Sequence, residues 1–317
     1  MTAAFIGIDW GTTHRRAALI GADGALLAER ADNEGALACK GRFGASLAEL
    51  IAGWPEADPA LPVVMAGMVG AAIGWQAVPY LDADTPLSAL AGHLVPVAEA
   101  SLGRRWFIVP GYCLRGDAGA VDVMRGEETQ LFGALHLLGP DAADGCYVLP
   151  GTHSKWVRLR AGRITELRTY MTGELFALLR QHGTLASAMQ TAGAHERAGM
   201  RHEGVADDPH FLQGVADAAA HPVLTHALFG ARARVVTGAL AASAATAYVS
   251  GLLIGAEWAD AQRHLSGDEP VRVIGEPALS ALHAACARHH GRRVEPLDAR
   301  QVQRAAWRAL AAQIQPA

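Results

Sequence analysis

The sequence predicts an α/β protein of two domains, and three observations lead to this. A chain of 317 residues is long for one hydrophobic core and fits two domains of ordinary size. Residues 5–30 and 146–169 repeat one pattern of strand, Gly-Thr turn, strand, glycine-containing turn and strand. Further on, a strand at 271–274 passes through glycine into a helix that runs to residue 287. A strand that leads into a helix in this way forms a ligand-binding crevice at the carboxyl end of a sheet.

The composition limits the classes of function. With 51% hydrophobic and 18% charged residues, the chain can fill hydrophobic cores and is not disordered. Its net charge of −4 includes no basic run, so we expect no nucleic-acid or membrane partner. The 14 histidines and four cysteines show no zinc-site spacing, and free thiols fit a reducing compartment. Neither a charged leader before an apolar stretch nor an apolar span of 18 residues occurs, so we expect a soluble cytoplasmic protein.

After the first hairpins, the chain alternates helix and strand patterns around an unusual loop. Residues 44–53 have helical spacing, and residues 61–66 read as a buried strand. A loop at 67–75, which combines spaced glycines with a tryptophan, follows this strand and leads to Tyr80. Such a loop lines a small-molecule pocket or makes a tight, packed connection, and the sequence favours neither. Another strand is expected at 106–111.

A polar segment at residues 122–130 leads into an apolar helix at 131–135. Glu127 and Glu128 would lie in the first helical turn, where the helix dipole favours carboxylates. Stabilisation of the helix end is therefore one interpretation. However, two acidic residues together with an arginine and a glycine are more than a helix cap requires. Phosphoryl transfer needs one carboxylate as the base and others near Mg²⁺. We favour the catalytic interpretation.

In the second half, a strand turns into an amphipathic helix over residues 170–179. The charged, glycine-containing stretch 192–213 is the best candidate for a mobile loop. Small and apolar residues at 239–261 predict a buried, closely packed helix, and residues 298–314 predict a terminal amphipathic helix.

The two Gly-Thr turns, at Gly11 and Gly151, suggest phosphate binding. Such a turn leaves backbone N–H groups exposed beside hydroxyls, which suits phosphate oxygens. Two turns that face each other would hold a polyphosphate between two lobes, as in a kinase. Lys155 would neutralise charge on a transferred group, or would only begin a strand with its amine in solvent. The chain has neither the G-x-G-x-x-G nor the P-loop pattern.

Together these turns and the Gly275 crevice resemble the actin-like, hexokinase-like and Hsp70-like ATPase superfamily. More narrowly, the chain resembles the 2-dehydro-3-deoxygalactonokinase family. The matching segments are 9–13, 67–70 with 74–75, 122–130, 149–156 and 171–175, with a weaker match at 250–257. The resemblance implies two RNase H-like (actin/hexokinase-like) domains with mixed sheets flanked by helices and a cleft between them. We expect the domains at 1–137 and 138–317, with a helix at about 299–317 that packs back on the first.

The resemblance implies that ATP and Mg²⁺ bind in the cleft. The γ-phosphoryl group would pass to the 6-hydroxyl of 2-dehydro-3-deoxy-D-galactonate in D-galactonate catabolism. Asp9 would hold Mg²⁺ through water, and Lys155 is the candidate cation. The residues expected around the phosphates and adenosine are Gly11, Thr12, Thr13, Gly151, Thr152, His153, Gly275, Glu276 and Pro277. Glu276 replaces a glycine that is common in sugar kinases.

For the catalytic base, the resemblance points to the start of the helix that closes the first domain. We favour Glu127, then Asp122, then Glu128. Arg125 is the candidate partner of the substrate carboxylate. The residues expected to contact the sugar acid are Gly67, Met68, Val69, Gly70, Trp75 and Tyr80.

Two alternatives remain open. An actin-like ATPase without an acceptor would use the same turns, although the chain shows no peptide-binding domain and no polymer-forming insertion. A kinase for 2-dehydro-3-deoxygluconate or another short sugar acid would differ at a single hydroxyl contact. The sequence also leaves open whether the protein forms a homodimer.

Overall fold

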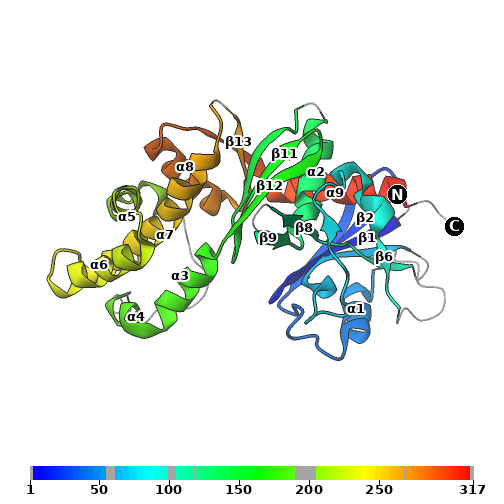
Figure 1. Ribbon diagram of the computed structural model, residues 1–317. Helices are drawn as coiled ribbons and strands as arrows, with labels where there is room; N and C mark the ends of the chain where they lie inside the picture. The colour runs from blue at the N-terminus through cyan, green and yellow to red at the C-terminus, as the bar shows by residue number, and fades with distance from the viewer. Residues whose placement is uncertain are drawn as a thin grey trace. The chain divides into compact units, whose positions relative to one another are not determined.

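The computed structural model describes residues 3–54, 61–98, 105–116, 119–140, 142–189, 205–267 and 269–314. They form an α/β protein of two compact units (Figure 1). Unit 1 consists of residues 1–144, 158–167 and 299–317, and unit 2 of residues 145–157 and 168–298. The first division therefore falls at 144/145 rather than at 137/138, and the C-terminal stretch is grouped with unit 1.

Unit 1 is built on a six-stranded mixed sheet in the order β3-β2-β1-β4-β7-β6. Its strands are β1 (Ala3–Trp10), β2 (Arg15–Gly21), β3 (Leu26–Asp32), β4 (Val63–Gly67), β6 (Val95–Pro96) and β7 (Trp106–Ile108). Strands β1, β4 and β7 run parallel, whereas β2 and β3 are antiparallel to their neighbours. The strands predicted at the start of the chain, at 61–66 and at 106–111 all occur.

The alternation of side chains along β1 gives the sheet two covered faces. Ile6 and Ile8 are fully or almost fully buried in a core cluster with Leu47 of α1 (Phe43–Ile51). On the opposite face, the rings of Phe5 and Trp307 lie 6.1 Å apart. Trp307 belongs to α9 (Ala299–Gln313), which packs on β1, β2 and α2 (Glu127–Leu138). A small sheet in the order β5-β8-β9 completes the strands of unit 1, with β5 at Leu81–Asp82, β8 at Tyr112–Arg115 and β9 at Val121–Met124.

Unit 2 repeats the strand order of unit 1. Its sheet has the order β12-β11-β10-β13-β14, so in both units the first four strands of the sheet lie in the order third, second, first and fourth. Beyond the fourth strand, unit 1 continues with β7 and then β6, whereas unit 2 continues with β14 alone. The strands are β10 (Gly145–Leu149), β11 (Ser154–Arg160), β12 (Arg163–Tyr170), β13 (Val271–Gly275) and β14 (Val294–Asp298), although residues 158–167 of the β11–β12 hairpin are grouped with unit 1. Strands β10, β13 and β14 run parallel. This repeated mixed sheet with flanking helices is the RNase H-like arrangement that the family resemblance implied.

The helices of unit 2 pack closely through small residues. They are α3 (Thr172–Gln181), α4 (Gly183–Met189), α5 (Pro209–Ala220), α6 (Leu224–Val236), α7 (Ala245–Ala261) and α8 (Pro277–His289). Gly251 of α7 lies against the backbone of α5, so a Cβ at this position would overlap the carbonyl oxygen of Phe211. The buried helix expected at 239–261 is thus α7, after a short 3-10 turn at Ala242–Ala244.

Three parts of the structure differ from expectation or add to it. Of the loop expected at 192–213, residues up to 204 lie outside the described residues. The remainder forms a 3-10 turn and the start of α5, which Asp208 caps by accepting a hydrogen bond from the backbone N–H of His210. Asp122, in the polar segment before α2, lies on strand β9, and the sequence pattern did not anticipate β14. Among the described helices, none is both long and apolar enough to cross a membrane.

We predict that Gly251→Ala lowers the free energy of unfolding by roughly 1–3 kcal/mol, because the new methyl group must displace the backbone of α5. Gly230→Ala is the matched control, since no atom lies within 4 Å of a Cβ built there on α6. It should leave stability unchanged or raise it by up to about 1 kcal/mol. Urea unfolding of the parent protein and the two variants tests this prediction. Equal unfolding midpoints would contradict the close packing of α5 and α7.

Candidate active site

Asp9 lies at the carboxyl end of β1, beside the end of β4. The two strands are parallel, and Asp9 and Ala66 are paired in register. A Cβ built at Gly67 would be 3.6 Å from the Asp9 carboxylate. The surrounding protein raises the pKa of the Asp9 carboxyl, an effect that the charge of Arg16 opposes. The Asp9 side chain itself is exposed.

The start of α2 meets this strand end through a second glycine. Gly126 precedes the helix with a φ of 112°, and Gly67 ends β4 with a φ of 91°. Residues other than glycine rarely adopt such backbone conformations. A Cβ at Gly126 would lie 3.4 Å from the Cα of Gly67. The first turn of α2 therefore lies next to Asp9, and this turn carries Glu127 and Glu128.

These two glutamates have different environments. Glu127 is half-buried and accepts a 3.0 Å hydrogen bond from the backbone N–H of Arg125. Glu128 is fully buried and accepts a 2.6 Å bond from the N–H of Gly126. Burial, and then the charge of Glu127, raise the pKa of Glu128 to about 8. Glu128 thus fastens the helix start from the inside, whereas Glu127 is more accessible.

The guanidinium of Arg125 uses only some of its N–H groups in hydrogen bonds to the described residues. Its Nη2 donates to the carbonyl of Val78 at 2.6 Å, and its guanidinium lies 4.3 Å from the ring centroid of Tyr80. Its Nε and Nη1 are buried and have no hydrogen-bond partner among the described residues. A Cβ built at Gly70 would be 2.9 Å from Nη1, so the glycine leaves space there. Buried N–H groups without a partner are costly, which points to a ligand that accepts from them.

The other residues expected at the sugar acid divide into two groups. Tyr80 is 42% exposed and covers the Arg125 guanidinium, which also lies beside Gly70, whereas Gly67 lies beside Asp9. Val69 is fully buried, and Met68 and Trp75 pack against the core cluster under α1. Trp75 stacks on Phe43 at 6.0 Å. For these three residues, the structure favours the packed connection that the sequence left open.

The first Gly-Thr turn joins β1 to β2. The N–H of Gly11 donates to the carbonyl of His14 at 2.9 Å, which closes the turn. The carbonyls of Gly11 and Thr12 accept hydrogen bonds from the N–H groups of Ala36 and Leu37. Thr12 and Thr13 are exposed. The turn is therefore held from one side and presents its hydroxyl side chains to solvent.

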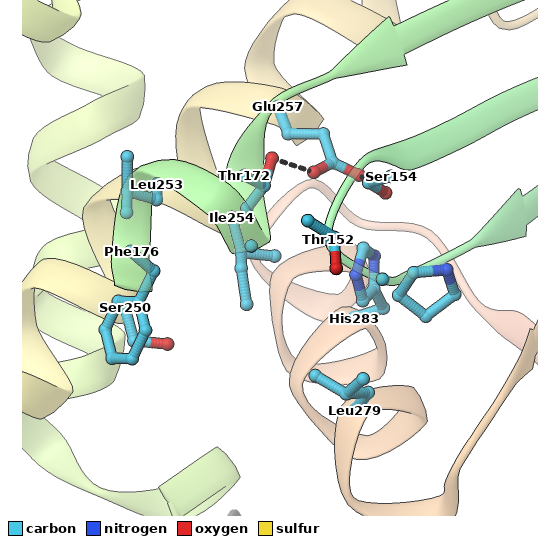
Figure 2. A pocket seen from close by; sticks show the side chains of 13 residues that line it. Thr152, Ser154, Thr172, Phe176, Ser250, Leu253, Ile254, Glu257, Leu279 and His283 are labelled. Atoms are coloured by element: carbon cyan, nitrogen blue, oxygen red, sulfur yellow. Dashed lines mark hydrogen bonds between the residues drawn. The ribbon is translucent and has the colours of Figure 1, made fainter. Parts of the chain in front are cut away.

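The second Gly-Thr turn borders a pocket of about 280 Å³ in unit 2 (Figure 2). The pocket lies among β10, β11, α3, α7 and α8. The lining residues are Pro150, Gly151, Thr152, Ser154, Thr172, Gly173, Phe176, Ser250, Leu253, Ile254, Glu257, Leu279 and His283.

Glu257 of α7 ties the turn to the helices. Its Oε1 accepts from the hydroxyl of Ser154 at 2.7 Å and from the indole N–H of Trp156 at 2.6 Å. Its Oε2 accepts from the hydroxyl of Thr172 at 2.6 Å, as Figure 2 shows. Because a buried carboxylate needs such donors, these bonds fix β11 and α3 against α7. We did not expect Glu257 as a site residue, although it ends the matching segment 250–257.

The turn also contacts the first residues of α3. The N–H of Glu174 donates to the carbonyl of Thr152 at 2.9 Å, and the His153 Nε2 lies 2.6 Å from the Glu174 carboxylate. A Cβ at Gly173 would overlap the carbonyl oxygen of Gly151, so only glycine permits this approach. Gly151, Thr152 and His153 are exposed on the outer side.

The remaining expected residues lie around this turn rather than in the pocket. A Cβ at Gly275 would be 2.9 Å from Pro150 Cγ, so β13 ends beside the turn. Glu276 and Pro277 are exposed at the start of α8. Lys155 is only 6% exposed, and its amine donates to the Thr169 hydroxyl at 2.9 Å. Its partner lies on β12 and its side chain does not line the pocket, which argues against a phosphate contact.

The raised pKa of Glu128 predicts a pH-dependent stability. Between the ordinary glutamate pKa of 4.5 and the folded pKa of about 8, the folded protein holds a proton that the unfolded chain has lost. The free energy of unfolding should therefore fall as the pH rises through this window, by up to about 1.4 kcal/mol per pH unit from this group. Glu128→Gln should remove that contribution.

Urea unfolding at pH 5, 6.5 and 8 measures the effect. Glu49→Gln is the control, because Glu49 is exposed on α1, and it should follow the parent protein at every pH. Parallel pH profiles of the parent and Glu128→Gln proteins would contradict a protonated Glu128.

Comparison with known proteins agrees with this geometry. The family model for 2-keto-3-deoxy-galactonokinase matches residues 9–311. The chain is 36% identical over 320 residues to a Rhizobium meliloti protein named "Probable 2-dehydro-3-deoxygalactonokinase DgoK1", with 100% of both chains covered. It is also 36% identical over 284 residues to the 2-dehydro-3-deoxygalactonokinase of Escherichia coli K12, with 89% of each chain covered.

Solved structures give the same result. A crystal structure from Sinorhizobium meliloti, described as a candidate 2-dehydro-3-deoxygalactonokinase, matches with a TM-score of 0.86 at 35% identity and covers 99% of this chain and 97% of its own. Component A of the Acidaminococcus fermentans (R)-2-hydroxyglutaryl-CoA dehydratase shares the fold at 12% identity, with a TM-score of 0.50 over 98% of this chain and 97% of its own. The chain belongs to the 2-keto-3-deoxy-galactonokinase family.

Proposed function

We propose that this protein is an ATP-dependent sugar-acid kinase that phosphorylates the 6-hydroxyl of 2-dehydro-3-deoxy-D-galactonate in D-galactonate catabolism. Membership of the family supports the reaction class, and relatives that match over most or all of the chain carry the corresponding name. The observation that carries the proposal in the structure is Arg125. It offers two buried side-chain N–H groups that have no partner among the described residues, one of them beside Gly70, and its backbone N–H donates to Glu127.

Arg125 would bind the carboxylate of the sugar acid. A guanidinium suits this role because its N–H groups match a carboxylate in geometry as well as in charge. Tyr80 lies over the guanidinium plane and orients it, and Gly70 leaves room beside Nη1. Gly67 would lie under the bound substrate, next to Asp9.

Glu127 would act as the general base for the substrate hydroxyl. It lies in the first turn of α2, where the helix dipole favours the ionised carboxylate that a base requires. Glu128 is a weaker candidate because it is fully buried and its pKa is raised to about 8. Asp122 lies on β9, where its carboxylate accepts from the N–H of Val123 at 2.8 Å.

ATP would bind at the pocket of unit 2 with part of the molecule inside it, and the turn at Gly151, Thr152 and His153 would lie next to its phosphates. A contact of Gly11, Thr12 and Thr13 with the phosphates, and of Gly275, Glu276 and Pro277 with the adenosine, stays a prediction from the family resemblance. Among the described residues, no group of three acidic, histidine or cysteine side chains could hold a metal ion.

A single exposed carboxylate such as Asp9 nevertheless fits Mg²⁺, which keeps most of its water ligands and binds substrate phosphates. The ion would neutralise charge on the transferred group. The protein's own contribution is to position the acceptor hydroxyl and the phosphate donor and to accept one proton. A cytoplasmic location fits this chemistry, since the four cysteines are buried free thiols.

The test is an assay of ADP release from ATP with a panel of aldonic and 2-dehydro-3-deoxy-aldonic acids. We expect release that depends on the sugar acid and is fastest with 2-dehydro-3-deoxy-D-galactonate. Preference for the gluconate epimer would revise the substrate within the same enzyme class. ADP release that no acid stimulates would instead support an actin-like ATPase.

We predict that Glu127→Gln lowers kcat by about 100-fold or more, because the substrate hydroxyl loses its proton acceptor. Asp122→Asn, assayed under the same conditions, should keep kcat within a few-fold of the parent value. Glu49→Gln controls for the loss of a carboxylate elsewhere in unit 1. A near-normal kcat for Glu127→Gln together with a large loss for Asp122→Asn would transfer the role to Asp122.

A further inference from the structure

The walls of the unit 2 pocket are mostly apolar. Phe176, Leu253, Ile254 and Leu279 contribute hydrocarbon surface from three helices, α3, α7 and α8 (Figure 2). A volume of about 280 Å³ is small, because small-molecule pockets span roughly 300–1,000 Å³. Such a pocket suits a flat heterocycle better than a whole nucleotide.

His283 of α8 supplies a polar group within this apolar lining. The ring is only 1% exposed, and it lines the pocket. Its Nδ1 lies 3.1 Å from the indole nitrogen of Trp258. Because an indole N–H can only donate, Nδ1 must accept this bond, and the imidazole proton must be on Nε2. The contact with Trp258 therefore fixes the tautomer of His283.

The imidazole is also kept neutral. Burial lowers the pKa of His283, and the charge of Glu257 opposes this only in part. His283 thus carries one N–H donor, on Nε2, for which the described residues provide no acceptor. A donor in the lining of a pocket is placed to bond to an acceptor atom of a bound ligand.

We propose that the Nε2–H of His283 donates a hydrogen bond to a ring nitrogen of the adenine of ATP, with the base held among the apolar side chains of the pocket. Adenine fits this environment because it is flat and carries unprotonated ring nitrogens at N1, N3 and N7. The inference rests on the proposed use of ATP and adds the residue that recognises the base. Trp258 acts as a positioning residue, since it determines which imidazole nitrogen carries the proton.

The experiment compares the binding of ATP with that of 1-deaza-, 3-deaza- and 7-deaza-ATP, measured by calorimetry on the full chain. Each analogue replaces one ring nitrogen with C–H and so removes one acceptor. We expect one analogue to bind about 3- to 10-fold more weakly than ATP, which is the usual effect of one hydrogen bond, while the other two bind like ATP.

A variant links this loss to His283. His283→Phe keeps a flat ring but has no donor, so ATP should bind about 3- to 10-fold more weakly and the selective loss with the one analogue should disappear. In turnover assays, the KM for ATP should rise while the KM for the sugar acid stays unchanged. His136→Phe is the matched control, because His136 is an exposed histidine on α2 in unit 1.

Each outcome of these experiments supports or overturns the inference. Equal binding of ATP and all three analogues by the parent protein overturns the inference, even if His283→Phe does not fold. A selective loss that persists unchanged in a folded His283→Phe protein also overturns it, because another residue then reads the base. Lack of binding by ATP and every analogue would overturn the proposed use of ATP as well, so the two failures are distinguishable.

Discussion

The close approach of Gly67 and Gly126 beside Asp9 is the constraint on which the site of unit 1 depends. Both residues have positive φ values, 91° and 112°. A Cβ at Gly67 would come within 2.8 Å of the Trp10 carbonyl oxygen, and one at Gly126 within 3.4 Å of the Cα of Gly67. Only glycines at both positions let the ends of β1 and β4 meet the start of α2. The carboxylate of Asp9 and the first turn of α2, which are far apart in the sequence, therefore lie near each other.

Two buried glutamates hold the two sites, and they do so by different means. Glu128 has a backbone N–H as its principal donor and a like-charged neighbour, Glu127, so burial dominates and its pKa rises. Glu257 accepts from three donors on β11 and α3. Glu128 fastens the start of α2, whereas Glu257 lines the pocket of unit 2 and fastens β11 and α3 against α7.

The sequence predicted the parts of the fold that have strong local signals. Alternating apolar residues and Gly-Thr turns marked the hairpins of both units, and helical spacing marked α1, α7 and α9. Strand β14 was missed because it contains Pro296 and polar residues, and a proline argues against a strand. The start of α5 was taken for a loop because its charged and glycine-containing neighbourhood concealed the cap at Asp208.

In the candidate sites, the sequence pointed to residues next to turns, but not to residues whose hydrogen-bond partners lie far away along the chain. Asp9, Gly67, Arg125 and Glu127 lie at the ends of recognisable elements, and their roles stay predictions from the family resemblance. Glu257 could not be found in this way, because its partners lie 85 to 103 positions away along the chain. A usable signal did exist for Lys155. It follows Ser154 on a strand, and alternation directs neighbouring side chains to opposite faces of the sheet.

The repeated strand order explains how one architecture gives two kinds of binding site. In each unit the first strand delivers a Gly-Thr turn at its carboxyl end, after β1 in unit 1 and after β10 in unit 2. What surrounds the turn differs. Loop backbone at Ala36 and Leu37 supports the first turn, which leaves the neighbouring strand end open to polar side chains. Helices α3, α7 and α8 enclose the second turn and line its pocket with hydrocarbon. Under the proposed function, the polar surroundings would accept the sugar acid and the apolar pocket the nucleobase, so the supporting elements rather than the turn itself would determine which ligand each unit accepts.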